Sequence, residues 1–270
     1  MLRRLGFLVR TDERRDVAAA FVFLMTFVGS HTVLETARDA LFLTRIPAER
    51  LPFVYLAIAA VSFVIARVQL ALPRSAPHRD MAAWCAFGGV GSIAFSFALP
   101  YMGDAGLYAL YVWPGVVATL ALVHFWTLLA GLFTATQAKR LFGVVGLGSM
   151  IGAVAGNGGM TLALRVAPPR WLVAVSGLGL LVASVLPLVF LRLEPGAVPE
   201  KKTREEGAPV GIAGYAHIFR GPYARRLVAI ALLASATLVF ADYVFKTSIV
   251  DALPKDRLAE ALGATYTVLN

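Results

Sequence analysis

Four ionisable side chains interrupt the first long apolar stretch of the sequence. His31, Glu35, Arg38 and Asp39 stand at positions i, i+4, i+7 and i+8. On an α-helix this spacing places all four on one face, while Val, Leu, Phe and Ala occupy the opposite face. An ionisable group at mid-bilayer costs from about 2.5 kcal/mol upward, so these groups should face protein or water rather than lipid.

A later apolar stretch carries Asp242 and Lys246, which are four residues apart and share a helix face. Arginine can bind phosphate or carboxylate through two parallel hydrogen bonds, and lysine adds a mobile point charge. Arg38 and Lys246 are therefore predicted to contact an anionic small-molecule substrate. Glu35, Asp39 and Asp242 are predicted to hold the two cations in place in the empty site, or to carry protons.

A purely structural interpretation of the same charges stays open. Glu35 with Arg38, and Asp242 with Lys246, can form neutralised ion pairs that only fix helix packing. The sequence alone does not distinguish this interpretation from the substrate site.

The secondary candidates for the site are His31, His124 and Tyr243. A lone histidine such as His124 is more typical of an interhelical hydrogen bond than of a proton carrier. Tyr243 stands beside Asp242 and can stack on a base, although tyrosines buried in membranes are more often structural.

The sequence carries no enzyme signature. It contains no P-loop, HExxH, GxSxG or Gly-rich dinucleotide motif, and no nucleophile and base at a recognisable spacing. The single cysteine, Cys85, excludes a disulfide framework and a Cys/His zinc pattern. We therefore predict no enzyme, no catalytic residues, no metal and no cofactor.

The elements that position these residues are predicted from composition. Of 270 residues, 59% are hydrophobic and only 15% are charged, and the mean hydropathy is +0.74, far outside the range of soluble proteins. Apolar windows long enough to cross about 30 Å of hydrocarbon, bounded by Pro and Gly, predict an all-α multi-pass membrane protein in a lipid bilayer. The windows are 17–43, 51–72, 81–102, 106–133, 142–166, 171–192 and 227–250.

Within the fifth window Gly148, Gly152 and Gly156 recur every four residues. This small-xxx-small spacing permits close helix crossing in membranes and predicts a role in helix packing.

The net charge of +9 is explained by membrane topology. Basic residues concentrate at the N-terminus and in alternate loops, which the positive-inside rule places in the cytoplasm. The prediction is a cell (inner) membrane protein with its N-terminus and long central loop in the cytoplasm, and nucleic-acid binding is not predicted.

Three segments follow from these windows. Residues 1–192 form an N-terminal six-helix half, residues 193–226 a polar cytoplasmic linker, and residues 227–270 the start of a second half with helix 7 and the beginning of helix 8. Because the chain stops at Asn270, we expect a fragment whose partner is the missing C-terminal half of the same protein.

An internal repeat supports this division. A shift of 207 residues aligns the segments IPAERL, 46–51, and LPKDRL, 253–258, each after a long apolar window. The same shift aligns Glu35 with Asp242 and Asp39 with Lys246.

The stretch HFWTLLAGLFTATQAKRLFGVVGLGSMIGAVAG, residues 124–156, resembles the ATP/ADP translocase (NTP/NDP exchange transporter) family. The resemblance lies in a Phe-Trp pair, an Ala-Lys-Arg segment and a Gly-x-Gly helix opening, here Phe125-Trp126, Ala138-Lys139-Arg140 and Gly146-Leu147-Gly148. Arg38-Asp39 is similar to the family's Lys-Asp pair in the first helix, and Asp242 with Phe245-Lys246 to its acid and aromatic-Lys pair in the seventh. This sequence has Pro114 where the family usually has a glutamate, and Arg38 in place of a lysine.

The resemblance implies a fold similar to the major facilitator superfamily and counter-exchange of nucleotides, such as ATP for ADP, by alternating access. Two alternatives stay open. One is a proton-coupled facilitator of another organic anion, with Asp242 or Glu35 as the titrating carboxylate. The other is a non-transporting membrane module that anchors or assembles a soluble partner domain.

Overall fold

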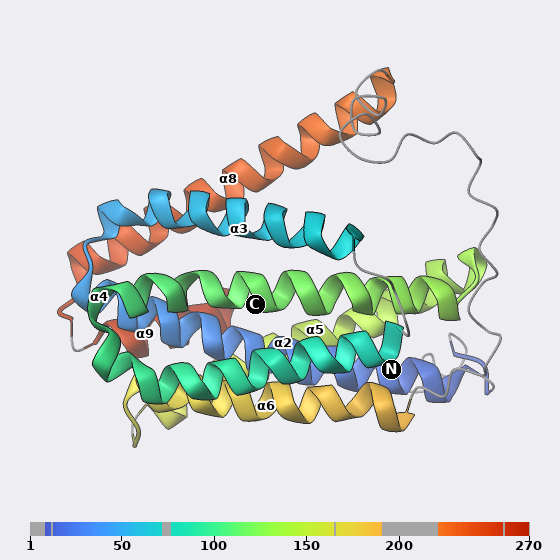
Figure 1. The fold of residues 1–270 in the computed structure, drawn as a ribbon, viewed down its shortest axis with the longest axis horizontal. Coiled ribbons are helices and arrows are strands. Elements are labelled where there is room, and N and C mark those ends of the chain that lie inside the picture. The colour runs from blue at the N-terminus through green and yellow to red at the C-terminus, as the bar shows by residue number, and fades with distance from the viewer. Residues whose placement is uncertain are drawn as a thin grey trace.

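The computed structural model describes residues 9–11, 13–71, 77–164, 166–190, 221–255 and 257–269, and every regular element in these ranges is helical (Figure 1). The predicted all-helical chain is therefore confirmed, whereas the arrangement of a major facilitator stays a prediction. The elements are α2 (Arg14–Arg45), the 3₁₀ helix η1 (Ala48–Arg50), α3 (Leu51–Ala71), α4 (Pro77–Leu132), α5 (Ala135–Ala163), α6 (Pro169–Phe190), α8 (Pro222–Ala252) and α9 (Leu258–Leu269).

Helix α4 contains two of the predicted segments. Its chain reverses direction near Gly103 (Figure 1), whose φ of 58° and ψ of −150° are not helical. This backbone conformation is essentially restricted to glycine. The two arms of α4 correspond to the predicted windows 81–102 and 106–133.

Six of the described helices, with α4 counted once, are long and apolar enough to cross a membrane. Large apolar side chains cover their outward faces: Phe53 on α3 is 67% exposed and Leu233 on α8 is 69% exposed. Such contiguous apolar surface is unfavourable in water and suits contact with lipid. The chain is thus a candidate multi-pass membrane protein.

Helices α5 and α8 begin furthest ahead of their hydropathy windows. Helix α5 begins at Ala135 rather than 142, after a capping box in which Thr134 and Gln137 bond each other's backbone N–H groups. Helix α8 begins at Pro222 rather than 227, with proline in its first turn. Polar first turns lower the mean hydropathy without ending a helix, so residues 222–226 of the predicted linker are helical. Residues 193–220 of that linker, with their basic residues at 201, 202, 204 and 220, and the basic residues at 3, 4, 74, 165 and 192 lie outside the described residues.

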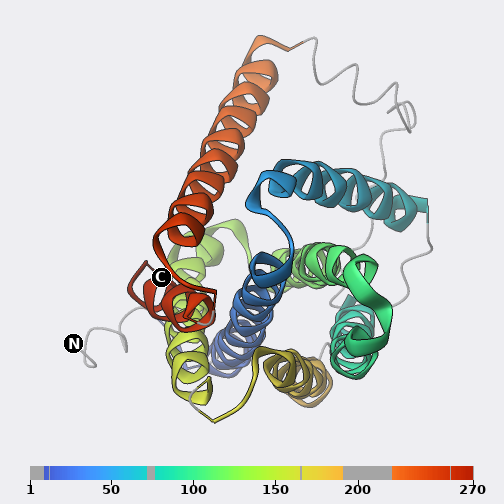
Figure 2. The same cartoon turned by 90° about the vertical axis from the view of Figure 1, so that its left-hand side faces the viewer.

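Helix α2 is the centre of the bundle and packs against α4, α5, α6 and α9 (Figure 2). Its closest neighbour in backbone approach is α5, through the predicted glycine stripe. A Cβ atom added at Gly148, Gly152 or Gly156 would collide with a carbonyl oxygen of α2. The three oxygens belong to Phe21, Met25 and Gly29. The glycines therefore let the two backbones lie in direct contact.

One end of this helix pair is joined by a polar contact. Glu13, just before α2, has a side chain only 4% exposed, and its carboxylate oxygens lie 2.6 and 2.7 Å from Nη2 of Arg140 on α5. The same carboxylate accepts hydrogen bonds from Gln137 Nε2 at 3.0 Å and from the Arg10 backbone N–H at 3.1 Å. The start of α2 is thereby fixed to the start of α5.

The two segments of the proposed repeat form turns with the same backbone hydrogen bonds. In each, an extended residue closes the preceding helix, its N–H bonds the carbonyl four residues earlier, and the arginine N–H bonds the proline carbonyl at 3.0 to 3.1 Å. A fully buried leucine then begins the next helix. The corresponding residues are Ile46, Pro47, Arg50 and Leu51 in the first turn and Leu253, Pro254, Arg257 and Leu258 in the second.

Helix α8 stands apart from the bundle over most of its length (Figures 1 and 2). It contacts η1, α3 and α9. Among its residues only Lys246, near the C-terminal end, is buried. The position at which α8 is held therefore coincides with one of the predicted site residues.

Candidate functional site

All five charged residues of the predicted site line one pocket of about 410 Å³. The pocket lies where α8 and α9 meet α2 and α5, and the five residues are Arg38, Lys246, Asp39, Asp242 and Glu35. Its volume is within the usual range for small-molecule sites. A second pocket, of about 580 Å³ at one end of the bundle, is lined by Arg45, Lys255 and Glu260 and contains none of the predicted residues.

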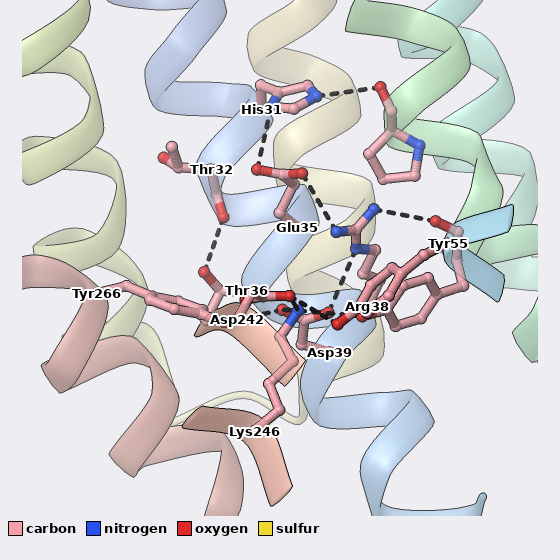
Figure 3. A network of polar contacts seen from close by, with 12 residues as sticks. His31, Thr32, Glu35, Thr36, Arg38, Asp39, Tyr55, Asp242, Lys246 and Tyr266 are labelled. Carbon is pink, nitrogen blue, oxygen red and sulfur yellow. Dashed lines mark hydrogen bonds and ion pairs between the residues drawn. The ribbon is translucent and has the colours of Figure 1, made fainter. Parts of the chain in front are cut away.

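Asp39 is the central anion of the site (Figure 3). Its Oδ2 lies 3.0 Å from Nζ of Lys246 and accepts a hydrogen bond of 3.1 Å from the Tyr266 hydroxyl. Its Oδ1 lies 3.4 Å from Nε of Arg38. One buried carboxylate from α2 therefore joins both predicted cations and links α2 to α8 and α9.

Lys246 has a polar partner for each of its three ammonium hydrogens. Besides Asp39, Nζ lies 2.8 Å from Oδ2 of Asp242 and donates to the Tyr111 hydroxyl at 3.0 Å. Asp242 is held in turn by the Tyr55 hydroxyl, which donates to the same oxygen at 2.7 Å. A lysine with a 2% exposed side chain is stable in this position because its charge is compensated and its donors are used.

Arg38 is held by a different set of groups. Its Nη2 lies 3.2 Å from Oε1 of Glu35, and its Nη1 donates to the backbone carbonyl of Tyr111 at 3.0 Å. The guanidinium also lies over the Tyr111 ring, 4.4 Å from the ring centroid, in cation–π contact. Tyr111 thus contacts Arg38 through its carbonyl and ring, and Lys246 through its hydroxyl.

His31 extends this network by one helical turn. Its Nδ1 lies 3.5 Å from Oε2 of Glu35, and its Nε2 lies 3.1 Å from the carbonyl oxygen of Pro114 on α4 (Figure 3). The ring stacks on Phe27 with centroids 5.9 Å apart. Each oxygen of the Glu35 carboxylate therefore has a basic side chain beside it, Arg38 at Oε1 and His31 at Oε2.

The charges of the site nearly cancel. Three carboxylates, Glu35, Asp39 and Asp242, surround two cations, Arg38 and Lys246. Buried charges are tolerated only when they are paired and hydrogen-bonded, and here each one is. An incoming anion must replace carboxylate contacts to reach either cation.

The ion pairs Glu35–Arg38 and Asp242–Lys246, expected from their helical spacing, are both present. The contact from Asp39 to Lys246 adds a connection between helices that spacing within one helix does not give. On the α5 side, the Thr36 hydroxyl lies 3.0 Å from Oδ1 of the buried Asn157, which closes the pocket wall.

The sequence analysis missed three tyrosines of the site, Tyr55, Tyr111 and Tyr266. A buried tyrosine hydroxyl generally needs a hydrogen-bond partner. Tyr55 and Tyr111 stand inside predicted apolar windows and Tyr266 after the last one, but a position in the sequence does not show which way the side chain points.

Two secondary candidates do not join the network of Figure 3. His124 lies further along α4, where its Nδ1 is 2.7 Å from the Leu120 carbonyl oxygen of its own helix and its ring lies near Trp84. Tyr243 is half-buried and packs against the apolar core. Among the described residues, the hydroxyl groups that contact the charged side chains of the site belong to Tyr55, Tyr111 and Tyr266.

Within the described ranges no three His, Cys, Asp or Glu residues are grouped to hold a metal ion. Cys85 is a buried free thiol. The described side chains at the site therefore offer charge and hydrogen bonding as their chemistry.

Comparison with known proteins gives no match: no protein-family model, no curated protein and no solved structure is similar to the chain.

Proposed function

We propose that the chain is an integral membrane transporter that binds an anionic solute of the nucleotide type and exchanges it, ATP against ADP, by alternating access. The observation that carries this proposal is the buried contact of 3.0 Å between Asp39 and Lys246, beside Arg38, in the wall of a 410 Å³ pocket. It supports a site in which one carboxylate occupies the place of a bound anion.

The geometry supports binding by replacement. A phosphate group can accept hydrogen bonds from Nε and Nη2 of Arg38 and from Nζ of Lys246. In the structure carboxylates occupy these three donors. Asp39 then loses Lys246, its partner on α8. Because this contact joins α2 to α8, binding an anion changes the interaction that holds the two helices together, which is the differential interaction that a conformational change requires.

The nucleotide class rests on the resemblance of residues 124–156 and of Arg38-Asp39 and Phe245-Lys246 to the ATP/ADP translocase family. The aromatic surroundings of the cations support it, since tyrosine rings offer stacking surfaces for a base. We place the chain in the cell membrane with its N-terminus and central loop in the cytoplasm, on the distribution of basic residues.

The test is uptake of radiolabelled ATP by cells that express the full-length gene, with and without excess unlabelled ADP, inorganic phosphate or a proton uncoupler. We expect uptake that ADP suppresses and the uncoupler spares. Arg38→Ala and Lys246→Ala should each reduce uptake at least tenfold, because losing one charged partner of a phosphate costs roughly 1.5–3 kcal/mol.

Matched controls are Arg45→Ala on α2 and Arg226→Ala on α8, which remove exposed cations that do not line the site pocket. They should leave uptake within about twofold of the unmodified chain when membrane levels are equal. Full uptake by the Arg38 and Lys246 variants would refute the site. Accumulation of another anion that the uncoupler abolishes would replace the proposal with a proton-coupled facilitator, and absence of any uptake would favour a non-transporting module.

A further inference from the structure

In Figure 3 His31 lies next to Glu35, which lines the pocket. The binding step above replaces the contact of Glu35 with Arg38 and does not use its contact with His31. We propose that this pair is a proton-binding site that sets the charge of the pocket, and thereby its affinity for an anion. The part concerning anion affinity rests on the proposed function, whereas the proton site does not.

The two ring nitrogens of His31 both face acceptors. Nε2 lies 3.1 Å from the Pro114 carbonyl oxygen, and a carbonyl oxygen can only accept, so Nε2 carries a hydrogen. Nδ1 lies 3.5 Å from Oε2 of Glu35. In a neutral ring with hydrogen on Nε2, the lone pair of Nδ1 points at a carboxylate. One further proton between these two atoms removes that repulsion.

The proton can be written in two positions with the same total charge. On Nδ1 it gives an imidazolium beside a carboxylate; on Oε2 it gives a neutral imidazole that accepts from a carboxylic acid. In both cases it comes from solvent and returns to solvent. The exchange would pass through Glu35, whose side chain lines the pocket and is 38% exposed, whereas the His31 side chain is 14% exposed.

The surroundings of the pair bring charges from several helices. Helix α2 supplies Arg38 and Asp39, α8 supplies Asp242 and Lys246, and the titratable hydroxyls are those of Tyr55 on α3, Tyr111 on α4 and Tyr266 on α9. From α5 the described contact is the uncharged Asn157. With the pair unprotonated, the site has three negative and two positive charges; one bound proton makes it neutral.

The sign of the effect follows from this charge. Protonation of the pair removes one net negative charge from the pocket wall, so an anion binds more tightly as the pH falls. For one charge close to the bound anion, at the high effective dielectric of a site open to water, the change in affinity is roughly tenfold. By linkage, a bound anion raises the affinity of the pair for its proton by the same factor.

The direct test is a pH titration, from pH 4 to 9, of the imidazole nitrogen signals of the full ¹⁵N-histidine-labelled chain in lipid nanodiscs. His31→Asn identifies the His31 signal among the four histidines. We expect Nε2 to stay protonated throughout, because its partner is a carbonyl oxygen, and the protonation of Nδ1 to change in Glu35→Gln, because that variant removes the carboxylate beside it. The exposed Glu49→Gln is the matched control and should leave the protonation of Nδ1 unchanged.

Either of two results would overturn the proton site: a His31 signal that does not titrate in this range, or a midpoint unchanged by Glu35→Gln. The His124 ring is bonded to a backbone carbonyl, so its signal should be the same in Glu35→Gln as in the unmodified chain. An unchanged His124 signal shows that the variant is folded.

The linked effect is measured by equilibrium binding of radiolabelled ATP above and below the His31 midpoint. ATP's own protonation is common to all variants and cancels when they are compared. The unmodified chain and Glu49→Gln should show about tenfold more pH dependence than Glu35→Gln and His31→Asn. Equal pH dependence in all four would overturn the control of affinity. A chain that titrates as expected but binds no ATP would contradict the proposed function and leave the proton site standing.

Discussion

Asp39 on α2 and Lys246 on α8 are 207 residues apart in the sequence and 3.0 Å apart in space. The same shift of 207 residues aligns the sequences of the two turn segments, 46–51 and 253–258, whose backbone hydrogen bonds are equivalent. The ion pair that links the two helices is thus formed between equivalent positions of the proposed repeat. Glu35 and Asp242, related by the same shift, both line the pocket beside it.

This pair should show strong energetic coupling. Asp39→Asn and Lys246→Gln each leave buried charge uncompensated and should lower the free energy of unfolding by about 3–5 kcal/mol. The double variant should lose less than the sum of the two, with a coupling energy of about 1–3 kcal/mol. Thermal unfolding of the detergent-solubilised chain measures all three. The exposed pair Glu49→Gln and Arg226→Ala serves as control and should be additive; additive losses at Asp39 and Lys246 would contradict the buried contact.

The glycine stripe of α5 predicts a position-specific effect of one methyl group. Gly152→Ala places a Cβ against the Met25 carbonyl oxygen of α2, where neither backbone can yield without separating the helices. We expect a loss of about 1–3 kcal/mol in unfolding free energy, as for overpacking in a core. Gly143→Ala on the same helix has nothing within 4 Å of the added atom and should be neutral or stabilising by up to about 1 kcal/mol. Equal effects at the two positions would show that α5 and α2 do not touch there.

The reversal inside α4 depends on backbone conformation rather than on space. An added Cβ at Gly103 meets no atom within 4 Å, yet its φ of 58° and ψ of −150° disfavour any L side chain. Gly103→Ala should therefore cost about 1–3 kcal/mol, measured by thermal unfolding. Gly146→Ala is the comparison. Gly146 has equally open space but lies in a regular helix, where alanine is favoured over glycine, so this substitution should not destabilise the fold. A neutral Gly103→Ala would mean that the reversal adopts another backbone form.

Glu13 predicts a dependence of stability on pH. Burial raises the pKa of its carboxyl, but the hydrogen bonds from the Arg10 backbone and Gln137, with the charge of Arg140, outweigh burial and hold the pKa below its ordinary value of 4.5. A lowered folded-state pKa stabilises the fold above the ordinary value, and this contribution is lost as the pH falls through the folded-state pKa. The melting temperature of Glu13→Gln should be lower than that of the unmodified chain at pH 7. The difference should shrink below about pH 4.5, and a difference independent of pH would contradict the ionised Glu13.

Much of the helix pattern could be predicted because it follows from local sequence. The hydropathy of each span, the prolines at the turns and Gly103 are properties of short segments, and helical spacing places Glu35 near Arg38 and Asp242 near Lys246. The first turns of α5 and α8 were missed because their polar residues lower hydropathy, while the capping box of α5 and the proline in the first turn of α8 favour helix.

The contacts between helices could not be predicted in the same way. Whether Asp39 bonds Arg38 alone or also Lys246 depends on the rotation and distance of α8 relative to α2, which no periodicity within one helix specifies. The tyrosine hydroxyls at Tyr55, Tyr111 and Tyr266 converge from three further helices for the same reason. The link from Glu13 to Arg140 joins residues far apart in the sequence, at the starts of α2 and α5.

Because α8 is sparsely packed, a small tilt at its buried end produces a large displacement at its other end. Lys246 is its only buried residue, and from Lys246 back to Pro222 the helix extends for about 36 Å at 1.5 Å per residue. A tilt of roughly 10° about Lys246 would move the far end by about 6 Å, with few side-chain contacts broken on the way. A small change in the contacts of the Lys246 ammonium group could thereby accompany a displacement of about one helical pitch, 5.4 Å, at the N-terminal end of α8.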